Sequence, residues 1–269
     1  MADFWEPFQF EFFRHGVLVA ALTGGLCGLV GTYVVLRGMS YIGHGLSHAI
    51  FGGAAASAVL GVSYFLGAGV WGIASALSVG RVTRRRVVGG DAAIGVVTTA
   101  GFAVGLVLFA LDSRARRDVD ALLFGSILGV DEADVAAVVA ATLLAGLVVF
   151  FAYRPLLFTT FDPEVAEASG VPTARLEALT MVVLSTSILV SMQVIGVTLV
   201  AANLVVPPSI ARLLTHRFSR MLWLSTVIGT VTGAVGMVAS YHLDTPSGAT
   251  ITLLAAALFV VAYGVTARK

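Results

Sequence analysis

Long apolar runs separated by short charged stretches make up most of this sequence. No charged residue lies within residues 17–36, 49–80 or 178–211. A helix of about 20 apolar residues crosses the roughly 30 Å hydrocarbon core of a bilayer. The pattern therefore predicts an all-α, polytopic membrane protein with nine transmembrane helices, which lie within residues 17–36, 42–80 (two helices), 92–111, 135–153, 178–211 (two helices), 221–241 and 250–267.

Two of these apolar runs are too long for a single helix and need an internal turn. We expect the first turn between Gly61 and Gly67 and the second at Gln193 and Gly196, because glycine readily ends a helix. An alternative arrangement has eight transmembrane helices, with residues 42–61 entering and leaving the membrane on the same side.

The first 13 residues are rich in aromatic and acidic side chains. Aromatic rings favour the headgroup level of a membrane. We therefore expect residues 1–13 to form an interfacial segment outside the cytoplasm, and residues 14–269 to form one transmembrane domain. The segment has no basic stretch ahead of a short apolar core, so we expect no cleaved signal peptide.

Composition supports the membrane assignment and excludes other classes of protein. The chain is 58% hydrophobic and 12% charged, whereas a soluble domain carries about 25% charged residues. Its formal net charge of +1, without a long basic patch, argues against nucleic acid as a partner. The single cysteine, Cys27, excludes an intramolecular disulfide and is expected to be a packing residue.

Arginines indicate the side of the membrane on which each loop lies, because loops rich in Lys and Arg stay in the cytoplasm. We expect the cytoplasmic segments to be Arg37 and residues 81–86, 154–175, 212–220 and 268–269. With nine helices, the N-terminus then lies outside the cell and the C-terminus in the cytoplasm. The loop 112–120 lies outside despite its three arginines, in conflict with the rule.

Two histidines stand in the glycine-containing stretch between the first two apolar runs. Glycines at 38, 43 and 45 are expected to loosen the backbone there. If helix resumes after Gly43, His44 and His48 share one helix face. Imidazole binds zinc and similar divalent metals, so the pair predicts a metal site at or beside the membrane. The alternative is two packing histidines that are hydrogen-bonded to nearby carbonyls.

The polar insert that follows residue 153 contains the signals for a short helix. Asp162 suits the N-cap, Pro163 the first helical position and Glu164 the first turn, and Gly170 ends the helix. A helix of about two turns within residues 161–172 has the shape needed to dock a moving cytosolic partner, although a solvated connector has the same caps. The residues assigned to this docking surface are Asp162, Pro163, Glu164, Glu167 and Gly170.

Polar residues also interrupt the long apolar run near residue 200. Gln193, Asn203 and the pair Pro207–Pro208 suggest a broken helix beside a transport pathway, which Ser47 would join from the histidine stretch. The alternative is simple loss of helical regularity at the two prolines.

Several stretches of the sequence match one family of transporters, in order, from about residue 12 to the C-terminus. These are Leu36–Gly43, Leu46–Ala49, Asp91–Gly95, Leu123–Val130, Phe161–Glu164, Val194–Gly196, Ala211–Leu214 and Leu243–Ala249. Together they resemble the permease subunit of the ABC-type importers that take up zinc, manganese or ferrous iron. The resemblance implies a fold similar to the vitamin B12 and siderophore importer permeases, shortened by one N-terminal helix.

The resemblance also implies a role for each matching residue. His48 matches the family's channel histidine, and His44 stands where the family usually has Asp. Because imidazole suits zinc and carboxylate suits manganese, this departure favours zinc as the transported substrate. The helix 162–170 resembles the coupling helix that docks on the ATPase. No permanently bound cofactor is implied.

The partners implied are a second copy of the chain, two cytosolic ATP-binding subunits and an extracytoplasmic metal-binding protein, in a bacterial plasma membrane. The sequence has no GxxxxGK[ST] phosphate loop, so nucleotide must bind on another chain. The subunit is therefore expected to transport and not to catalyse.

Other functions remain to be weighed. The same architecture with Mn²⁺ or Fe²⁺ as cargo is the first alternative. A secondary transporter driven by an ion gradient would need acidic residues at membrane depth, and the apolar runs contain almost none. An intramembrane metalloprotease would need an HExxH motif, and no base separates His44 from His48. His15 and His242 lie near the expected outer surface, where isolated histidines are usually solvated.

Overall fold

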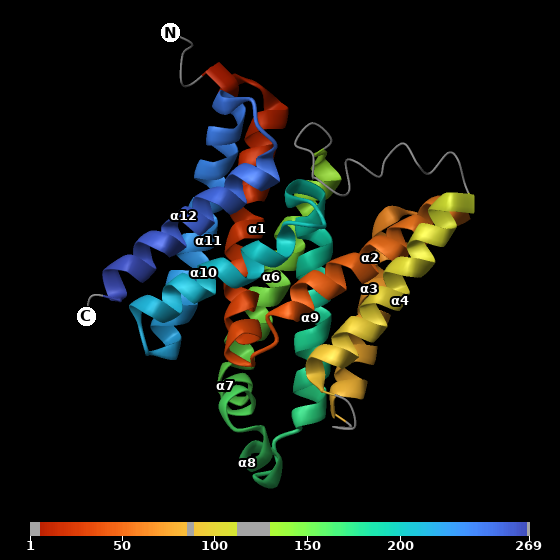
Figure 1. Ribbon diagram of the computed structural model, residues 1–269, viewed down its shortest axis with the longest axis vertical. Coiled ribbons are helices and arrows are strands. Elements are labelled where there is room, and N and C mark those ends of the chain that lie inside the picture. The colour runs from red at the N-terminus through yellow and green to blue at the C-terminus, as the bar shows by residue number, and fades with distance from the viewer. Residues whose placement is uncertain (1–5, 85–88, 112–129, 268–269) are drawn as a thin grey trace.

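The computed structural model describes residues 6–84, 89–111 and 130–267, and this part of the chain is entirely helical. The helices shown in Figure 1 are η1 (Glu6–Gln9), α1 (Glu11–Leu36), α2 (Tyr41–Leu60), α3 (Tyr64–Arg84), α4 (Gly90–Leu111), α6 (Glu132–Phe151), α7 (Tyr153–Phe161), α8 (Pro163–Ala168), α9 (Thr173–Ile195), α10 (Val200–Leu214), α11 (Phe218–Leu243) and α12 (Ser247–Thr266).

Nine transmembrane helices were predicted, whereas seven helices in the described part are long and apolar enough to cross a bilayer. These seven are α1, α3, α4, α6, α9, α11 and α12. Two predicted spans are not among these seven helices. They are α2, which carries both imidazoles, and α10, whose 15 residues reach only about 22 Å. The chain therefore folds helically in every predicted span, but α2 and α10 fall short of the apolarity or length expected of a membrane-crossing helix.

Several boundaries also differ from the prediction. Helix α1 begins at Glu11, so the expected interfacial segment 1–13 overlaps its first turn. Residues 154–161, expected to be part of the polar insert, belong to the separate helix α7, which begins at Tyr153. The predicted turns are present, since Gly61 and Gly196 end α2 and α9 with positive φ angles of 66° and 89°. The loop 112–120 and the tail 268–269 lie outside the described residues.

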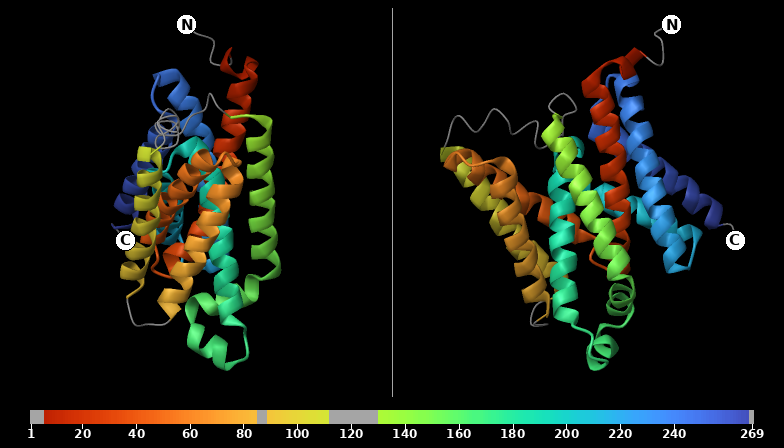
Figure 2. Two further views of the ribbon diagram at one scale, coloured as in Figure 1. Left: turned by 90° about the vertical axis from the view of Figure 1, so that its right-hand side faces the viewer. Right: turned by 180° about the vertical axis from the view of Figure 1, so that it is seen from behind.

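Helix α1 lies at the centre of the bundle and packs most extensively against α11 (Figure 2). A Cβ added to Gly24 would collide with the Gly229 carbonyl, and one added to Gly28 would collide with the Ser225 carbonyl. The two backbones therefore approach as closely as small residues permit, which is how membrane helices pack in the absence of a hydrophobic driving force.

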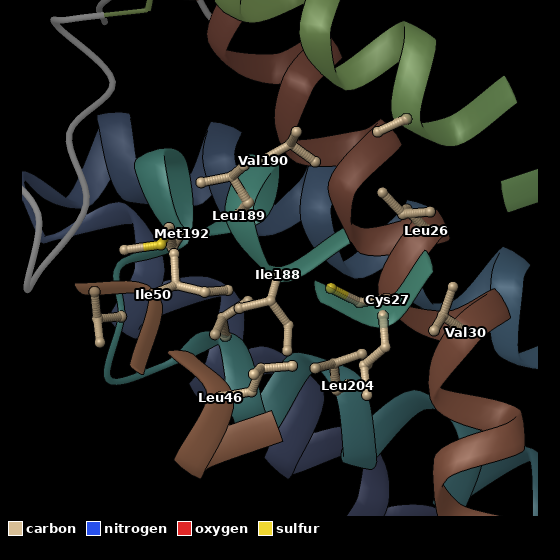
Figure 3. Close-up of a cluster of buried hydrophobic side chains, with 14 of the residues drawn as sticks. Leu26, Cys27, Val30, Leu46, Ile50, Ile188, Leu189, Val190, Met192 and Leu204 are labelled. Atoms are coloured by element: carbon tan, nitrogen blue, oxygen red, sulfur yellow. The ribbon is translucent and has the colours of Figure 1, made fainter. Parts of the chain in front are cut away.

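The buried core joins α1, α2, α9 and α10 around one cluster of apolar side chains (Figure 3). Leu26, Cys27 and Val30 project from α1 toward Ile188 of α9 and Leu204 of α10. Cys27 is fully buried, and its Sγ lies 3.5 Å from Ser191 Oγ, in agreement with the packing role predicted for it. The core thus ties the histidine-bearing helix α2 to the central helix.

Helix α10 continues through both prolines to Leu214, so the helical regularity expected to fail there is kept. Proline has no N–H, and Pro208 therefore cannot donate to the Leu204 carbonyl one turn before it. That carbonyl lies against Gly31 of α1, where an added Cβ would collide with it. The prolines thus leave a carbonyl facing a glycine on the neighbouring helix.

The connections of the chain lie at two opposite ends of the molecule (Figure 1). One end of the molecule contains the turn after α1, the end of α3 that is predicted to be cytoplasmic, and the helices α7 and α8. Helix α8 projects beyond the bundle there. The N-terminal helix η1 and the end of α11 lie at the other, where the rings of Phe13 and Tyr241 are 5.0 Å apart. The basic segments Arg37 and 154–175 therefore share one end, as the arginine pattern predicts.

Candidate functional site

Helix α2 carries the two histidines and starts at Tyr41, before Gly43. Gly38 has a φ of +67° and forms the turn, as predicted, but Gly43 and Gly45 lie within regular helix and do not loosen it. Instead they allow close packing. A Cβ at Gly45 would lie 2.7 Å from Thr98 Oγ1 of α4, and one at Gly43 would lie 3.0 Å from Leu204 Cδ1 of α10. Glycine thus seats α2 between α4 and α10.

His44 and His48 share one face of α2, as their spacing predicts. Their ring centroids are 4.6 Å apart with an interplanar angle of 81°. The His48 ring also meets Phe102 of α4 edge-on, with 4.7 Å between centroids. His48 Nδ1 is buried and has no hydrogen-bond partner among the described residues. The alternative of two packing histidines requires a carbonyl to accept a hydrogen bond from each ring, and His48 Nδ1 makes no such bond with any residue that the structure describes.

The two imidazoles are the pair of metal ligands that this face of α2 brings together. In the described ranges, no group of three or more His, Cys, Asp or Glu side chains lies close enough to hold a metal ion. Two neutral imidazoles can hold a divalent metal, but they leave most of its coordination positions open. An ion held only by this pair is therefore easily exchanged.

Ser47, Gln193 and Asn203 each have a hydrogen-bond partner other than an imidazole ring. Ser47 is fully buried, and its hydroxyl donates to the His44 carbonyl at 2.8 Å within the same helix. Asn203 Nδ2 donates to Thr252 Oγ1 of α12 at 3.3 Å. Gln193 hydrogen-bonds the carboxylate of Asp134, at the start of α6. Each of the three therefore joins helices or closes a turn.

Asp134 is a buried carboxylate that the sequence reasoning missed. Its Oδ2 accepts from the Asp131 backbone N–H at 3.2 Å, while Asp131 Oδ1 accepts from the Asp134 N–H at 2.9 Å. This reciprocal capping box begins α6. The pair of aspartates three residues apart, ahead of an apolar run, is a signal from which this helix start could have been read.

The predicted surface helix is present as α8. Asp162 Oδ1 accepts from the Val165 N–H at 3.0 Å, Pro163 opens the helix, and Gly170 has a φ of +83°. The Val171 N–H donates to the Ala166 carbonyl at 3.0 Å, which closes a Schellman motif. The remaining docking candidates, Glu164 and Glu167, are exposed on its surface.

His15 and His242 lie at the end of the molecule opposite to α8. His15 is partly buried in the second turn of α1, and His242 is exposed in the last turn of α11 beside Tyr241. The two residues therefore belong to the same end of the fold, as predicted, but they are separate from the histidine pair on α2.

A family model described as "ABC 3 transport family" matches residues 9–266, which is nearly the whole chain. The chain belongs to the ABC 3 transport family. This confirms the family that the sequence motifs indicate.

Curated ABC 3 relatives match over nearly their full lengths. The manganese transport system membrane protein MntC of Halalkalibacterium halodurans is 35% identical over 260 residues, covering 97% of this chain and 89% of that protein. MntB of Synechocystis is 33% identical, covering 99% and 90%. A probable iron transport system membrane protein of Haemophilus influenzae is 35% identical, covering 96% and 94%.

Solved structures agree with the ABC 3 assignment. The PsaBC structure from Streptococcus pneumoniae in complex with Fab matches with a TM-score of 0.87 and 30% identity, covering 97% of this chain and 95% of that one. A putative metal-chelate type ABC transporter in an inward-facing conformation matches with a TM-score of 0.71 at 18% identity, covering 93% and 85%. The second match shows the fold alone, and it bears out the predicted permease architecture.

Proposed function

We propose that this chain is the membrane permease of an ABC importer that moves a divalent transition metal into the bacterial cytoplasm. Two copies form the pathway, two separate ATP-binding subunits drive it, and an extracytoplasmic binding protein delivers the ion. The permease lies in the plasma membrane with its N-terminus outside and its C-terminus in the cytoplasm. This orientation follows from the arginines at the end of the molecule where α8 projects.

One observation carries the proposal: an imidazole pair stands on a buried helix of a chain that matches metal permeases along its length. Polar groups at membrane depth are costly, and ionisable ones usually belong to a transport site. His44 and His48 hold the ion briefly, and water or the second copy fills the other coordination positions. Weak holding is useful, because transport requires release on the far side.

Manganese or ferrous iron is the cargo that the relatives favour, and this differs from the zinc preference expected from the sequence. The similar MntC and MntB proteins are named for manganese, and the Haemophilus relative for iron. Zinc remains the second candidate for one reason. His44 supplies a second imidazole, and two imidazoles suit zinc better than manganese.

Helix α8 is the surface through which the ATP-binding subunit acts. It projects from the bundle, its two ends are capped, and its exposed face carries Glu164 and Glu167. Phe161 and Val165 add apolar side chains, which are 59% and 50% exposed. A capped, projecting helix with a mixed apolar and acidic face suits a groove on a partner protein.

The test is ATP-dependent uptake into proteoliposomes that contain the permease, its ATP-binding subunit and its binding protein. Wild type and His44→Asp are compared with Mn²⁺, Fe²⁺ and Zn²⁺ in turn. We expect wild type to carry Mn²⁺ or Fe²⁺, and His44→Asp to carry less Zn²⁺ relative to Mn²⁺. A wild type that carries only Zn²⁺ would establish the second candidate.

The same assay can reject the proposal. If no divalent metal enters the vesicles although ATP is hydrolysed, the chain transports something else. If the metal profile of His44→Asp equals that of wild type, the binding protein alone selects the ion and the histidine pair only conducts it.

A further inference from the structure

A polar contact joins the end of α7 to the turn that precedes the histidine helix. Arg37 follows the last residue of α1, and its guanidinium reaches across to α7. Arg37 Nε donates to Thr160 Oγ1 at 3.3 Å, and Arg37 Nη2 donates to Thr159 Oγ1 at 3.3 Å. The guanidinium is partly buried, and the two threonine side chains are nearly fully buried. The contact is thus partly shielded from water.

The threonine hydroxyls are oriented to receive this guanidinium. A hydroxyl has one proton to donate and two lone pairs to accept with. Thr160 Oγ1 donates its proton to the Leu156 carbonyl at 2.7 Å, and Thr159 Oγ1 donates to the same carbonyl at 3.2 Å. Both protons are therefore used within α7, and the lone pairs are left for Arg37. Helix α7 thus presents a fixed acceptor pair.

The two sides of this contact lead to the two functional parts of the molecule. Thr160 stands two residues before Asp162, the N-cap of α8. Arg37 stands four residues before Tyr41, the first residue of α2. The turn between α1 and α2 is closed by the Met39 N–H, which donates to the Val34 carbonyl at 3.0 Å. From there, the histidines lie within about 10 Å along α2.

A carboxylate on α9 also lies near the guanidinium. Glu177 attracts Arg37 electrostatically, and its Oε2 lies 3.7 Å from Arg84 Nη1 at the end of α3. Cavities of about 240 and 260 Å³ flank Glu177, the first lined also by Arg37 and the second by Arg84. The guanidinium therefore has free space next to it.

We propose that Arg37 is the positioning residue that passes movement of α8 to the histidines on α2. The inference rests on the proposed function, in which α8 docks on the ATP-binding subunit. When α8 is displaced, the threonines at the end of α7 move with it and pull the guanidinium. The turn then carries the start of α2, and the imidazole pair shifts relative to α4.

The first test measures Mn²⁺ uptake and ATP hydrolysis in the same proteoliposomes. We expect Arg37→Gln and the double variant Thr159→Val/Thr160→Val to hydrolyse ATP but to move about tenfold less Mn²⁺ per ATP, a typical coupling loss. Combining the two changes adds no further loss, because both remove one contact. Thr159→Ser/Thr160→Ser keeps both acceptors and retains the wild-type ratio.

Arg175→Gln is the matched control, since Arg175 is an exposed arginine at the same end of the molecule. It retains the wild-type ratio. The inference is overturned if uptake and hydrolysis fall in parallel, or if uptake per ATP is unchanged in the double valine variant. If Arg37→Gln does not assemble, the double valine variant still tests the inference, because valine has the shape of threonine.

A second test does not depend on the cargo. Spin-label pairs report the distance from α11, at Val235→Cys, to the exposed C-terminal end of α8, at Ser169→Cys, or to the exposed first residue of α2, at Tyr41→Cys. In the complex with the ATP-binding subunit, nucleotide should change both distances in wild type. In Arg37→Gln it should change only the distance to α8. If the α2 distance still changes, the inference fails. If the labels behave as expected but vesicles take up no metal, only the proposed function fails.

Discussion

The contact between α1 and α11 and the contact between α2 and α4 both depend on glycine, but they are packed differently. Between α1 and α11, Gly24 and Gly229 each leave room for the main-chain carbonyl of the other. Between α2 and α4, such backbone contact is found at Gly52, which faces the Gly101 carbonyl. Close to the histidines, Gly45 instead faces the side chains of Thr98 and Ile94.

The difference shows which part of the bundle can move. A backbone carbonyl in contact with a glycine yields only if a whole helix shifts, whereas a contact with side-chain atoms can also be relieved by a small shift of the side chain. Helices α1 and α11 thus form a fixed frame. Helix α2 is held firmly at Gly52, in its second half, and less firmly at Gly45, where it carries His44 and His48.

The largest expected effect is on the fixed frame. Gly229→Ala places a methyl group on the Gly24 carbonyl, and we expect the free energy of unfolding to fall by about 3 kcal/mol. Thermal unfolding of the purified permease in detergent measures this change. Gly146→Ala on α6 is the control: its added methyl contacts nothing within 4 Å, and it should gain up to about 1 kcal/mol from helix propensity. Equal unfolding midpoints for Gly229→Ala and Gly146→Ala would show that the α1–α11 contact does not depend on glycine.

The next effect concerns the histidine face. His48→Ala should lower ATP-driven Mn²⁺ uptake roughly tenfold to hundredfold, the range found when interactions around a bound metal are removed. His216→Ala, which changes an exposed histidine in the turn before α11, should leave uptake unchanged. Uptake that survives in His48→Ala would mean that the imidazole pair is only a packing feature.

Gly45→Ala sharpens the comparison directly. Its methyl group meets the γ atoms of Thr98 and Ile94 and no main-chain carbonyl, so we expect a loss of about 2 kcal/mol in the free energy of unfolding, smaller than that of Gly229→Ala. We also expect uptake to fall several-fold, because the adjusted side chains hold the histidine end of α2 more tightly. The idea of a yielding contact is wrong if this variant unfolds as easily as Gly229→Ala.

The smallest effect should come from a hydrogen bond across the fixed frame. Ser225 Oγ donates to the Gly28 carbonyl at 2.6 Å, and Thr32 Oγ1 donates to the same carbonyl at 2.9 Å. Ser225→Ala therefore leaves that carbonyl satisfied and should cost only about 0.5 kcal/mol in the free energy of unfolding. A loss of several kcal/mol in the thermal unfolding of this variant would show that the frame depends on polar contacts as much as on glycine.

Local signals made some features predictable from the sequence. The caps of α8 are set by Asp162, Pro163 and Gly170, which act within one turn, and the common face of His44 and His48 follows from their spacing. Other features depend on distant partners. Gln193 binds Asp134, and Asn203 binds Thr252, and no spacing along the chain reveals these pairs.

The predicted count of nine transmembrane helices differs slightly from the seven helices of the described residues that are long and apolar enough to cross a membrane. The difference lies in α2, whose glycines and histidines lower its apolarity, and in α10, which has only 15 residues. Helix α7 was missed because Arg154 was taken as the start of a loop, although Pro155 lies in the first turn of a new helix. The preference for zinc followed from His44 alone, and the relatives favour manganese or iron.

The proline pair of α10 has a consequence for how this sequence can vary. The Leu204 carbonyl, which Pro208 cannot serve, points at Gly31 on α1, and the Cα hydrogens of glycine are weak donors to such an oxygen. A side chain at position 31 would remove that contact and push α10 away. Position 31 is therefore restricted to glycine by the backbone of a helix far along the chain, so its mutational tolerance is set by α10 and not by its own helix.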